Sequence, residues 1–358
     1  MLSISATPDS LHCLMKHCII VLIACLCVHG QPTQGPLNEY LNVRRSDFPD
    51  DFLFGASTSA AQIEGSTKSG GKGPSAWDQF IREFPDKIMD KSNMEVAADS
   101  YNRYKATQGG QIGISHVAQY FEPYSNTSLD EEASKRSIDF ELGWFMEPLV
   151  RGDYPESMRR LVKDRLPVFS AEEKELVKGS FDFIAISYYS SRYAKDIPTS
   201  PDAAPVSYLV DSNVNVTVEK DGVPIGPNAG GSAFIYVYPE GLYKILKFME
   251  ENYSKNITIY ITENGYTEKS DDNILISQTL KDDIRIDFVQ KHLYQIQTAI
   301  KNGVNVKGYF YYSLIDSFEW GEGYTVRYGL YHVDFKNLTR SPKESAKWYH
   351  DFIKGVTK

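Results

Sequence analysis

Five short runs of apolar residues, rich in β-branched and aromatic side chains, recur along the chain and alternate with segments of helical periodicity. Runs in which nearly every side chain avoids water are typical of strands that are buried on both faces, as in parallel sheets. Strands that alternate with helices indicate an α/β fold. The predicted strands cover residues 52–59, 111–117, 181–189, 257–262 and 306–314.

Apolar residues spaced three or four positions apart predict the helices between these strands. The helix that begins at Pro239 and the helix that ends before Gly303 have the clearest boundaries, because proline favours the first helical turn and glycine favours the end. Ser170 with Glu173, and Ser341-Pro342 with Glu344, have the spacing of capping boxes that begin two short helices. The longer predicted helices cover residues 93–105, 130–145, 239–252 and 283–302, the last with Ile284, Phe288, Ile296 and Ile300 on its buried face.

Composition and charge narrow the classes of function. The 358 residues are 42% hydrophobic and 24% charged, which is ordinary for a globular protein. The net charge is −9 and no basic cluster stands out, so we expect no nucleic-acid partner. Aromatic residues make up 13% of the chain; their rings suit sugar faces and a large core equally well. We predict neither a metal site nor an organic cofactor.

The N-terminal 30 residues have the pattern of a secretory signal peptide. Lys16 and His17 precede an apolar run that ends near Gly30, and this run is short for a membrane span. A membrane anchor is the alternative; with cleavage at Gly30 we expect no membrane association. All four cysteines precede Gly30, so no disulfide framework is expected in residues 31–358, which we interpret as a single domain.

Five Asn-x-Ser/Thr sequons follow the predicted signal peptide. Such motifs also occur by chance, but together with a signal peptide they indicate glycosylation in the secretory pathway, with an extracellular (apoplastic) or vacuolar destination. The acceptor residues are Asn126, Asn215, Asn252, Asn256 and Asn337.

The strand at residues 257–262 leads into Glu263-Asn264-Gly265. A carboxylate at the end of a buried strand is costly unless a partner or a reaction uses it. A salt bridge is one explanation, and catalysis is the other, since the carboxyl ends of strands carry the chemistry in parallel barrels. Ile-Thr-Glu-Asn-Gly resembles the nucleophile signature of glycoside hydrolase family 1, the retaining β-glycosidases. The resemblance implies a (β/α)8 TIM barrel with Glu263 as the nucleophile.

Other segments resemble the same family in the same order. Phe-Gly-Ala-Ser-Thr-Ser-Ala-Ala-Gln62 resembles its first strand, and Ser187-Tyr188-Tyr189 its sixth. The resemblance implies that Gln62 binds sugar hydroxyls and that Tyr189 orients Glu263. Phe-Glu319-Trp320 resembles the sugar-binding signature, with a carboxylate for two hydroxyls and an indole for the ring. Taken singly, each could be an ordinary strand-end residue. Tyr312 replaces a family Trp and Ser317 a family Asn, so glucose specificity is open.

The resemblance is interrupted after Lys105. Ala106 begins a segment that resembles the lead-in to the fifth family strand, so strands two to four are missing and the barrel is incomplete. Five strands cannot close an eight-stranded barrel. Either the first and fifth strands pair with each other, or two sheet edges stay open.

The interruption also removes the family's acid/base motif, Asn-Glu-Pro, which occurs nowhere in the chain. Glu122 and Glu147 also precede proline, but both fall in predicted loops, and we interpret them as solvated carboxylates. The resemblance thus implies retaining hydrolysis of a small-molecule β-glucoside, with weakened activity because general acid–base help is worth about 10²- to 10⁴-fold. The alternatives are a non-catalytic sugar-binding or regulatory product and a transglucosidase.

Overall fold

The computed structural model describes residues 40, 42–63, 65, 75–98, 113–198, 207–254, 256–271 and 273–356. Two compact units divide the chain, residues 1–42 and residues 43–358. The second unit contains nearly all described residues. The predicted signal peptide and the interruption at Lys105/Ala106 lie outside the described residues. In the described part of the chain, no helix combines the length and the apolar character that a membrane span requires.

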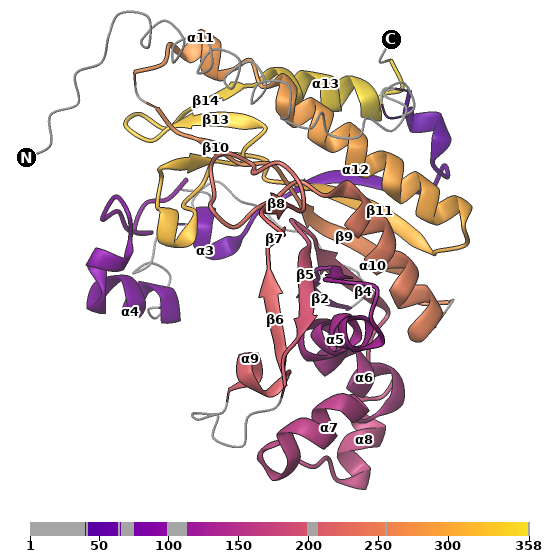
Figure 1. Ribbon diagram of the computed structural model, residues 1–358. Helices are drawn as coiled ribbons and strands as arrows, with labels where there is room; N and C mark the ends of the chain where they lie inside the picture. The colour runs from indigo at the N-terminus through magenta and orange to yellow at the C-terminus, as the bar shows by residue number, and fades with distance from the viewer. Residues whose placement is uncertain are drawn as a thin grey trace, which may run out of the picture. The chain divides into compact units, whose positions relative to one another are not determined.

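A five-stranded sheet forms the centre of the unit formed by residues 43–358 (Figure 1). Its order is β1-β11-β9-β4-β2, and every neighbouring pair is parallel. The prediction of an α/β fold with a parallel sheet is confirmed. The strands are β1 (Leu53–Ser57), β2 (Gly113–Val117), β4 (Phe183–Ser187), β9 (Ile259–Asn264) and β11 (Val306–Tyr312).

The sheet has two open edges. Among the described residues, β1 pairs only with β11 and β2 pairs only with β4, so the first and last strands of the sheet do not meet. Of the two predicted alternatives, the open sheet is the one observed. Apolar side chains are exposed at both edges: Leu53 is 51% exposed on β1, and Val117 is 60% exposed on β2.

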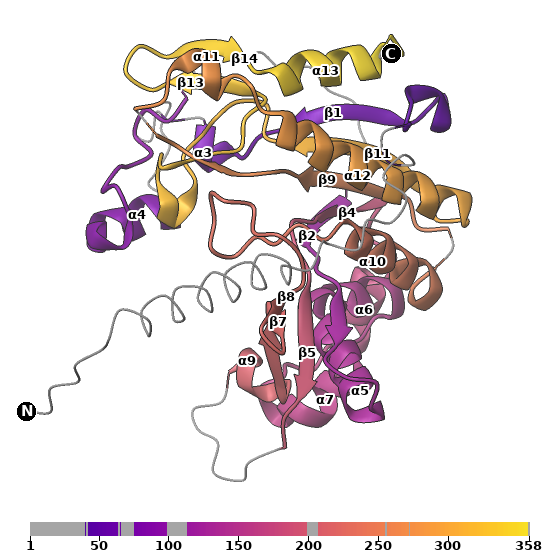
Figure 2. The same ribbon diagram turned by 45° about the horizontal axis from the view of Figure 1, so that its top comes forward.

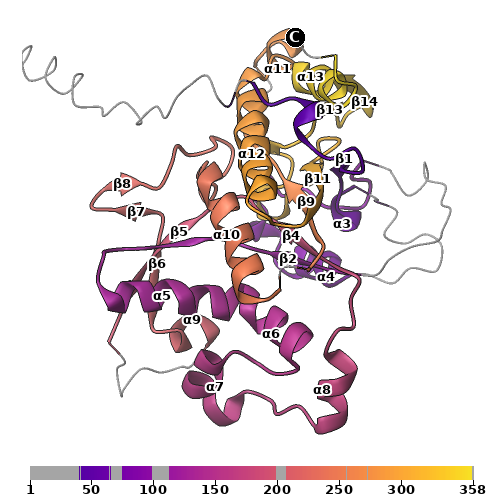
Figure 3. The same cartoon turned by 90° about the vertical axis from the view of Figure 1, so that its right-hand side faces the viewer.

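Three helices cover one face of the sheet. They are α10 (Pro239–Asn252), α12 (Asp283–Lys301) and α13 (Glu344–Ile353), and Figures 2 and 3 show α10 and α12 side by side along it. Ile259 and Ile261 of β9 pack into the same core as Leu246 and Ile296, because alternate residues of a strand face the same side. Pro239 begins α10 as the sequence predicts.

A second group of helices follows β2. The predicted helix at 130–145 is confirmed as α5 (Ser128–Ile138), which continues through a π-helical turn, η4 (Asp139–Gly143), into α6 (Trp144–Arg151). The capping box of Ser170 and Glu173 is present. The remaining elements of this group are α7 (Glu156–Val162), η5 (Lys163–Arg165) and α8 (Ala171–Val177).

The insertion between β4 and α10 carries secondary structure of its own. Strand β3 (Phe121–Pro123) pairs with β5 (Arg192–Asp196), and β5 pairs with β6 (Val214–Thr217) to make a small sheet against α5. The other elements of the insertion are α9 (Tyr208–Asp211), β7 (Glu219–Lys220) and β8 (Val223–Pro224).

Short elements flank the strands of the central sheet. The elements that precede β2 are η1 (Arg45–Asp47), α3 (Ala60–Ile63), α4 (Ala76–Glu83) and η2 (Pro85–Lys87). Those that follow β9 are β10 (Glu268–Lys269), α11 (Ile276–Thr279), η6 (Trp320–Glu322), β12 (Val326–Arg327), β13 (Tyr331–Asp334) and β14 (Thr339–Pro342).

Three local predictions are wrong. Residues 93–98, the described part of the helix predicted at 93–105, form turns, with Ala97 at a φ of 48°. Ile284, placed on the buried face of α12, is 59% exposed because the neighbouring Arg285 takes the buried position in the first turn of the helix. Ser341 and Pro342 belong to β14, which pairs with β13, so α13 begins at Glu344 without a side-chain cap. Sheet pairing there overrides the local capping signal.

Candidate functional site

Glu263 lies at the carboxyl end of β9, the middle strand of the sheet. The Tyr189 hydroxyl donates a hydrogen bond to Glu263 Oε2 at 2.8 Å, and the backbone N–H of Tyr188 donates to the Glu263 carbonyl at 2.9 Å. Burial raises the pKa of the Glu263 carboxyl, while hydrogen bonds from Tyr189 and Ser187 act in the opposite direction. The carboxylate is therefore oriented by its neighbours and only partly solvated.

The two residues that follow Glu263 hold the strand end in place. Asn264 is completely buried; its Nδ2 donates to the Tyr188 carbonyl at 2.8 Å, and its Oδ1 accepts from the Tyr309 hydroxyl at 2.9 Å. Gly265 has no room for a side chain, since a Cβ there would lie 1.8 Å from the Tyr312 carbonyl oxygen. Asn264 and Gly265 thus have structural roles. The Glu263 carboxylate, which precedes them at the end of the strand, is available for chemistry.

Gln62 and Glu319 form the second part of the site. Gln62 lies on the short helix α3, directly after β1, and its Nε2 donates to Glu319 Oε2 at 2.9 Å and to the Phe318 carbonyl at 2.8 Å. The Ser317 hydroxyl donates to Glu319 Oε1 at 2.7 Å. Burial, assisted by the charges of Asp316 and Glu263, raises the pKa of Glu319 to about 8. The raised pKa favours the protonated form of this carboxyl, which can donate as well as accept hydrogen bonds.

Aromatic residues connect the two parts. The Tyr312 ring lies edge-on to Tyr189 and Tyr328, with centroids 6.0 and 5.6 Å away. Tyr312 is 3% exposed, and among the described residues its hydroxyl has no hydrogen-bond partner of normal geometry. The negative charges of Glu319 and Glu263 add to burial in raising its pKa, so the phenol stays protonated.

Trp320 lies at the outer side of this arrangement. Its indole is 38% exposed and meets the Trp77 ring of α4 at a centroid distance of 4.9 Å. The pair forms an open aromatic surface next to Glu319, its neighbour in the chain. Sequence reasoning singled out Trp320 for sugar stacking, and the structure adds Trp77 beside it.

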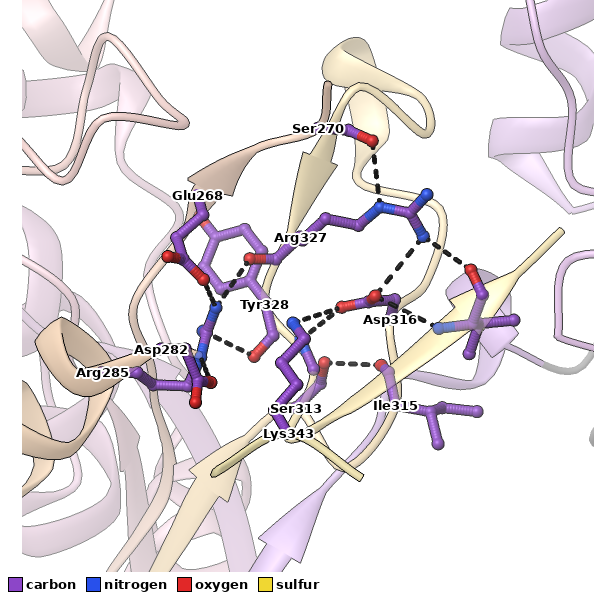
Figure 4. Close-up of polar contacts among 12 residues, drawn as sticks. Glu268, Ser270, Asp282, Arg285, Ser313, Ile315, Asp316, Arg327, Tyr328 and Lys343 are labelled. Carbon is purple, nitrogen blue, oxygen red and sulfur yellow. Dashed lines mark hydrogen bonds and ion pairs between the residues drawn. The ribbon is translucent and has the colours of Figure 1, made fainter. Parts of the chain in front are cut away.

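A buried network of charges braces the loops behind the site (Figure 4). Arg285, fully buried on α12, bonds the carbonyls of Tyr266 and Tyr328 and pairs with Asp282 at 2.8 Å. Arg285 therefore joins the loop after Glu263 to the segment after η6. Sequence reasoning missed this residue, because an arginine on a helix is usually solvated and its pattern carries no sign of burial.

Asp316 belongs to the same network and holds in place the segment that carries Ser317 and Glu319 (Figure 4). Both Asp316 and Lys343 are completely buried, and Lys343 Nζ lies 3.1 Å from Asp316 Oδ1. Although burial acts to raise the pKa of Asp316, the nearby cations Lys343 and Arg327 hold it below its usual value. Asp316 directly precedes Ser317, so this ion pair fixes the backbone from which Ser317 and Glu319 reach into the site.

The prediction that the two glutamates preceding prolines are solvated loop carboxylates is wrong: Glu122 lies in β3 and Glu147 in α6, and both are largely buried in ion pairs. Glu122 bonds the Tyr238 hydroxyl at 2.9 Å and pairs with Lys244, and Glu147 pairs with Arg151. Among the described residues, neither forms a hydrogen bond or an ion pair with Glu263. Within the described ranges, no group of three or more histidine, cysteine or acidic residues has the geometry of a metal site.

Comparisons with known proteins agree with this architecture. The family model described as "Glycosyl hydrolase family 1" matches residues 44–108 and 105–357. The two matches meet at the predicted interruption near Lys105/Ala106. They cover most of the chain as two separate pieces of one family.

Curated relatives show the same division. Rice (Oryza sativa subsp. japonica) "Beta-glucosidase 12" is 48% identical over 252 residues, which is 70% of this chain and 49% of that protein. This chain thus spans about half the length of the curated relatives it matches at this level. Rice "Beta-glucosidase 24" is 30% identical over 478 aligned positions, with 87% of this chain and 94% of that protein covered. An alignment longer than the 358-residue chain contains long gaps in it.

A solved structure matches the fold. "Rice Os3BGlu6 Beta-Glucosidase" superposes with a TM-score of 0.82 at 27% identity, covering 88% of this chain and all of that chain. The likeness extends to both ends of the neighbour although the described residues of this chain form a central sheet of five strands. The sheet described above is therefore the remaining part of a (β/α)8 barrel.

Proposed function

Because this chain belongs to glycosyl hydrolase family 1, we propose that it binds β-glucosides and that Glu263 forms a covalent glycosyl ester with them. The observation that carries the proposal is the pairing of Glu263 with Tyr189 at 2.8 Å, beside the group formed by Gln62 and Glu319. Relatives named β-glucosidases support the substrate class.

The covalent step needs few groups. A Glu263 carboxylate oxygen forms a bond to the anomeric carbon, and the bond from that carbon to the aglycone oxygen breaks. Tyr189 keeps the carboxylate oriented, while Gln62, Glu319 and Trp320 hold the sugar hydroxyls and ring. The departing oxygen leaves with the electron pair and needs a proton unless it is stable as an anion.

A second carboxyl group is the missing part. Retaining glycosidases place it about 5 to 5.5 Å from the nucleophile, where it protonates the leaving group and later activates water. The Asn-Glu-Pro motif that supplies this group in the family is absent from the sequence. We therefore expect aryl glucosides with acidic phenols to react at Glu263, and unactivated alkyl glucosides to bind without turnover. Hydrolysis of the ester should be slow.

The test is labelling with 2,4-dinitrophenyl 2-deoxy-2-fluoro-β-glucoside, followed by intact and peptide mass spectrometry. We expect one fluoroglucosyl adduct, located on Glu263 and absent from Glu263→Gln. Glu122→Gln is the matched control, because it alters a carboxyl group that pairs with Lys244 away from the site. An unlabelled chain, or an adduct on another residue, would contradict the proposal.

Non-catalytic sugar binding is the second candidate. It is favoured by Glu319, a carboxyl group with a raised pKa that is held by Gln62 and Ser317. This arrangement does not depend on the missing catalytic acid. Saturable glucose binding by a chain that never becomes labelled would support this candidate over the first. Transfer of glucose to an added alcohol faster than to water would instead indicate a transglucosidase.

We also infer that the chain enters the secretory pathway. The five sequon asparagines, Asn126, Asn215, Asn252, Asn256 and Asn337, are all exposed, as N-glycosylation requires. Expression in plant cells followed by peptide N-glycosidase digestion tests this inference. A mobility shift on digestion is expected, and an unglycosylated chain in the cytosolic fraction would refute it.

A further inference from the structure

A cavity lies apart from Glu263, between the π-helical turn η4 and the small sheet that contains β5 and β6. Its volume is about 360 Å³, which falls at the lower end of the range for small-molecule sites. Glu141, Gln119 and Arg192 supply polar groups to its wall. The apolar part of the wall consists of Phe121, Phe140, Val214 and Val216.

One hydrogen-bond acceptor among these polar groups has no partner in the described part of the chain. Glu141 accepts from the backbone N–H of Gln119 at 2.9 Å and from Gln119 Nε2 at 3.1 Å. These two bonds point the amide nitrogen at the carboxyl group and turn Gln119 Oε1 away from it. That oxygen is buried and has no hydrogen-bond partner among the described residues. An unsatisfied buried carbonyl is unfavourable, so a ligand hydroxyl that reached it after a small rotation of the Gln119 side chain would be held firmly.

Charge selects the kind of donor. Arg192 is fixed by the carbonyls of Ser191 and Phe234, at 2.8 and 2.6 Å, and its charge acts on Glu141 without direct contact. Burial raises the pKa of Glu141 to about 7, against the lowering effect of Gln119 and Arg192. A cation would meet the guanidinium and an anion would meet the carboxyl group, so neither is favoured. A hydroxyl group both donates and accepts, which satisfies Gln119 Oε1 and its neighbours together.

We propose that this cavity is a second binding site, separate from Glu263, for a neutral polyhydroxylated molecule the size of one sugar residue. Phe121 and Phe140 supply apolar contact for its carbon skeleton, and Gln119 and Glu141 bind its hydroxyls. A π-helical turn supports a binding role, because such turns recur at functional sites.

The site is connected to the edge of the sheet. Gln119 follows β2 by two residues, and the backbone N–H of the intervening Ala118 donates to the Ser187 carbonyl at 3.0 Å. Ser187 is paired with Glu263 in the sheet. A bound molecule would therefore hold the end of β2, an edge strand, against the strand that flanks the nucleophile.

Saturation-transfer NMR on the full chain tests the proposal with myo-inositol, a neutral cyclic polyol that has no anomeric carbon. We expect saturation transfer that persists in Glu319→Gln, because the second site does not use that carboxyl group. The signal should fall at least fivefold in Gln119→Leu, which removes the free acceptor. It should fall equally in Val216→Trp, which fills the cavity from a residue that is 46% exposed and leaves the polar groups intact.

Val223→Trp is the matched control, because Val223 is 65% exposed on β8 and does not line the cavity. Its signal should equal that of the unaltered chain. Circular dichroism establishes that each variant is folded; if Gln119→Leu is not, Val216→Trp decides. Absence of transfer in the unaltered chain, or full transfer in both cavity variants, would overturn the proposal. Loss of the signal in Glu319→Gln alone would assign the binding to the first site.

Discussion

The middle of the sheet and its two edges are held in different ways. Glu263 ends a strand that is paired on both sides, and the loops behind it are joined by Arg285 and Lys343, both fully buried. The edge strands β1 and β2 have one partner each among the described residues, and they expose Leu53 and Val117. The end of the strand that carries Glu263 is thus held by contacts within the described part of the chain. The resemblance to the family implies that the absent strands would have closed the sheet and supplied a proton donor.

The largest effect should come from the buried network. Arg285→Met removes the cation that pairs with Asp282 and Glu268, leaving buried acceptors unsatisfied. We expect a loss of about 3–5 kcal/mol in the free energy of unfolding, measured by urea denaturation. Lys91→Met is the control, since the Lys91–Asp86 pair is 72% and 86% exposed, and surface pairs contribute about 0–1 kcal/mol. Equal losses in the two variants would show that the network is not the source of rigidity.

The next largest effect concerns how the free energy of unfolding depends on pH. Glu319 has a pKa of about 8 in the native state, whereas its pKa in the unfolded chain is near the ordinary value of 4.5. Between these values the native state binds the extra proton, so the free energy of unfolding falls as pH rises, by up to about 1.4 kcal/mol per pH unit. Glu319→Gln should make this fall less steep between pH 5 and 8 in denaturation series. An unchanged slope would mean that Glu319 is ionised in the native state.

A smaller effect is expected on the rate at which Glu263 is labelled. Tyr189→Phe removes the 2.8 Å hydrogen bond to Glu263 and keeps the ring that packs on Tyr312 and Tyr328. A hydrogen bond to a charged group is worth about 1.5–3 kcal/mol, so labelling of Glu263 should slow by about 10- to 100-fold. Tyr124→Phe, which loses an exposed hydroxyl bonded to Asp221, should label at the original rate. Unaltered labelling of Tyr189→Phe would remove Tyr189 from the site.

The smallest effect on stability should occur at the open edges. Val117→Lys places a charge on β2 at a position that is 60% exposed, so the free energy of unfolding should change by less than about 0.5 kcal/mol. Its self-association in sedimentation velocity should be reduced, because charged edge strands resist pairing between chains. Concentration-dependent association that is identical in the variant would indicate that this edge is not used.

Local patterns were sufficient for the elements. The predicted helix at 239–252 has the observed bounds of α10, and all five predicted strands occur in the sheet. These predictions succeed because periodicity and capping act over a few residues. The helix prediction fails at residues 93–98, the described part of 93–105, which form turns, and the capping prediction at 341–344 fails because Ser341 and Pro342 belong to the β13–β14 pair.

The sequence by itself determined which residues end the strands and which family they resemble, since both are read from contiguous letters. Only the tertiary structure decided how they meet: Tyr189 bonds a residue 74 positions away, and Gln62 bonds one 257 positions away. Among the described residues it also decided that the sheet stays open, that Arg285 is buried, and that burial raises the pKa of Glu319. These properties depend on burial and on distances between remote segments, which no local pattern of side chains encodes.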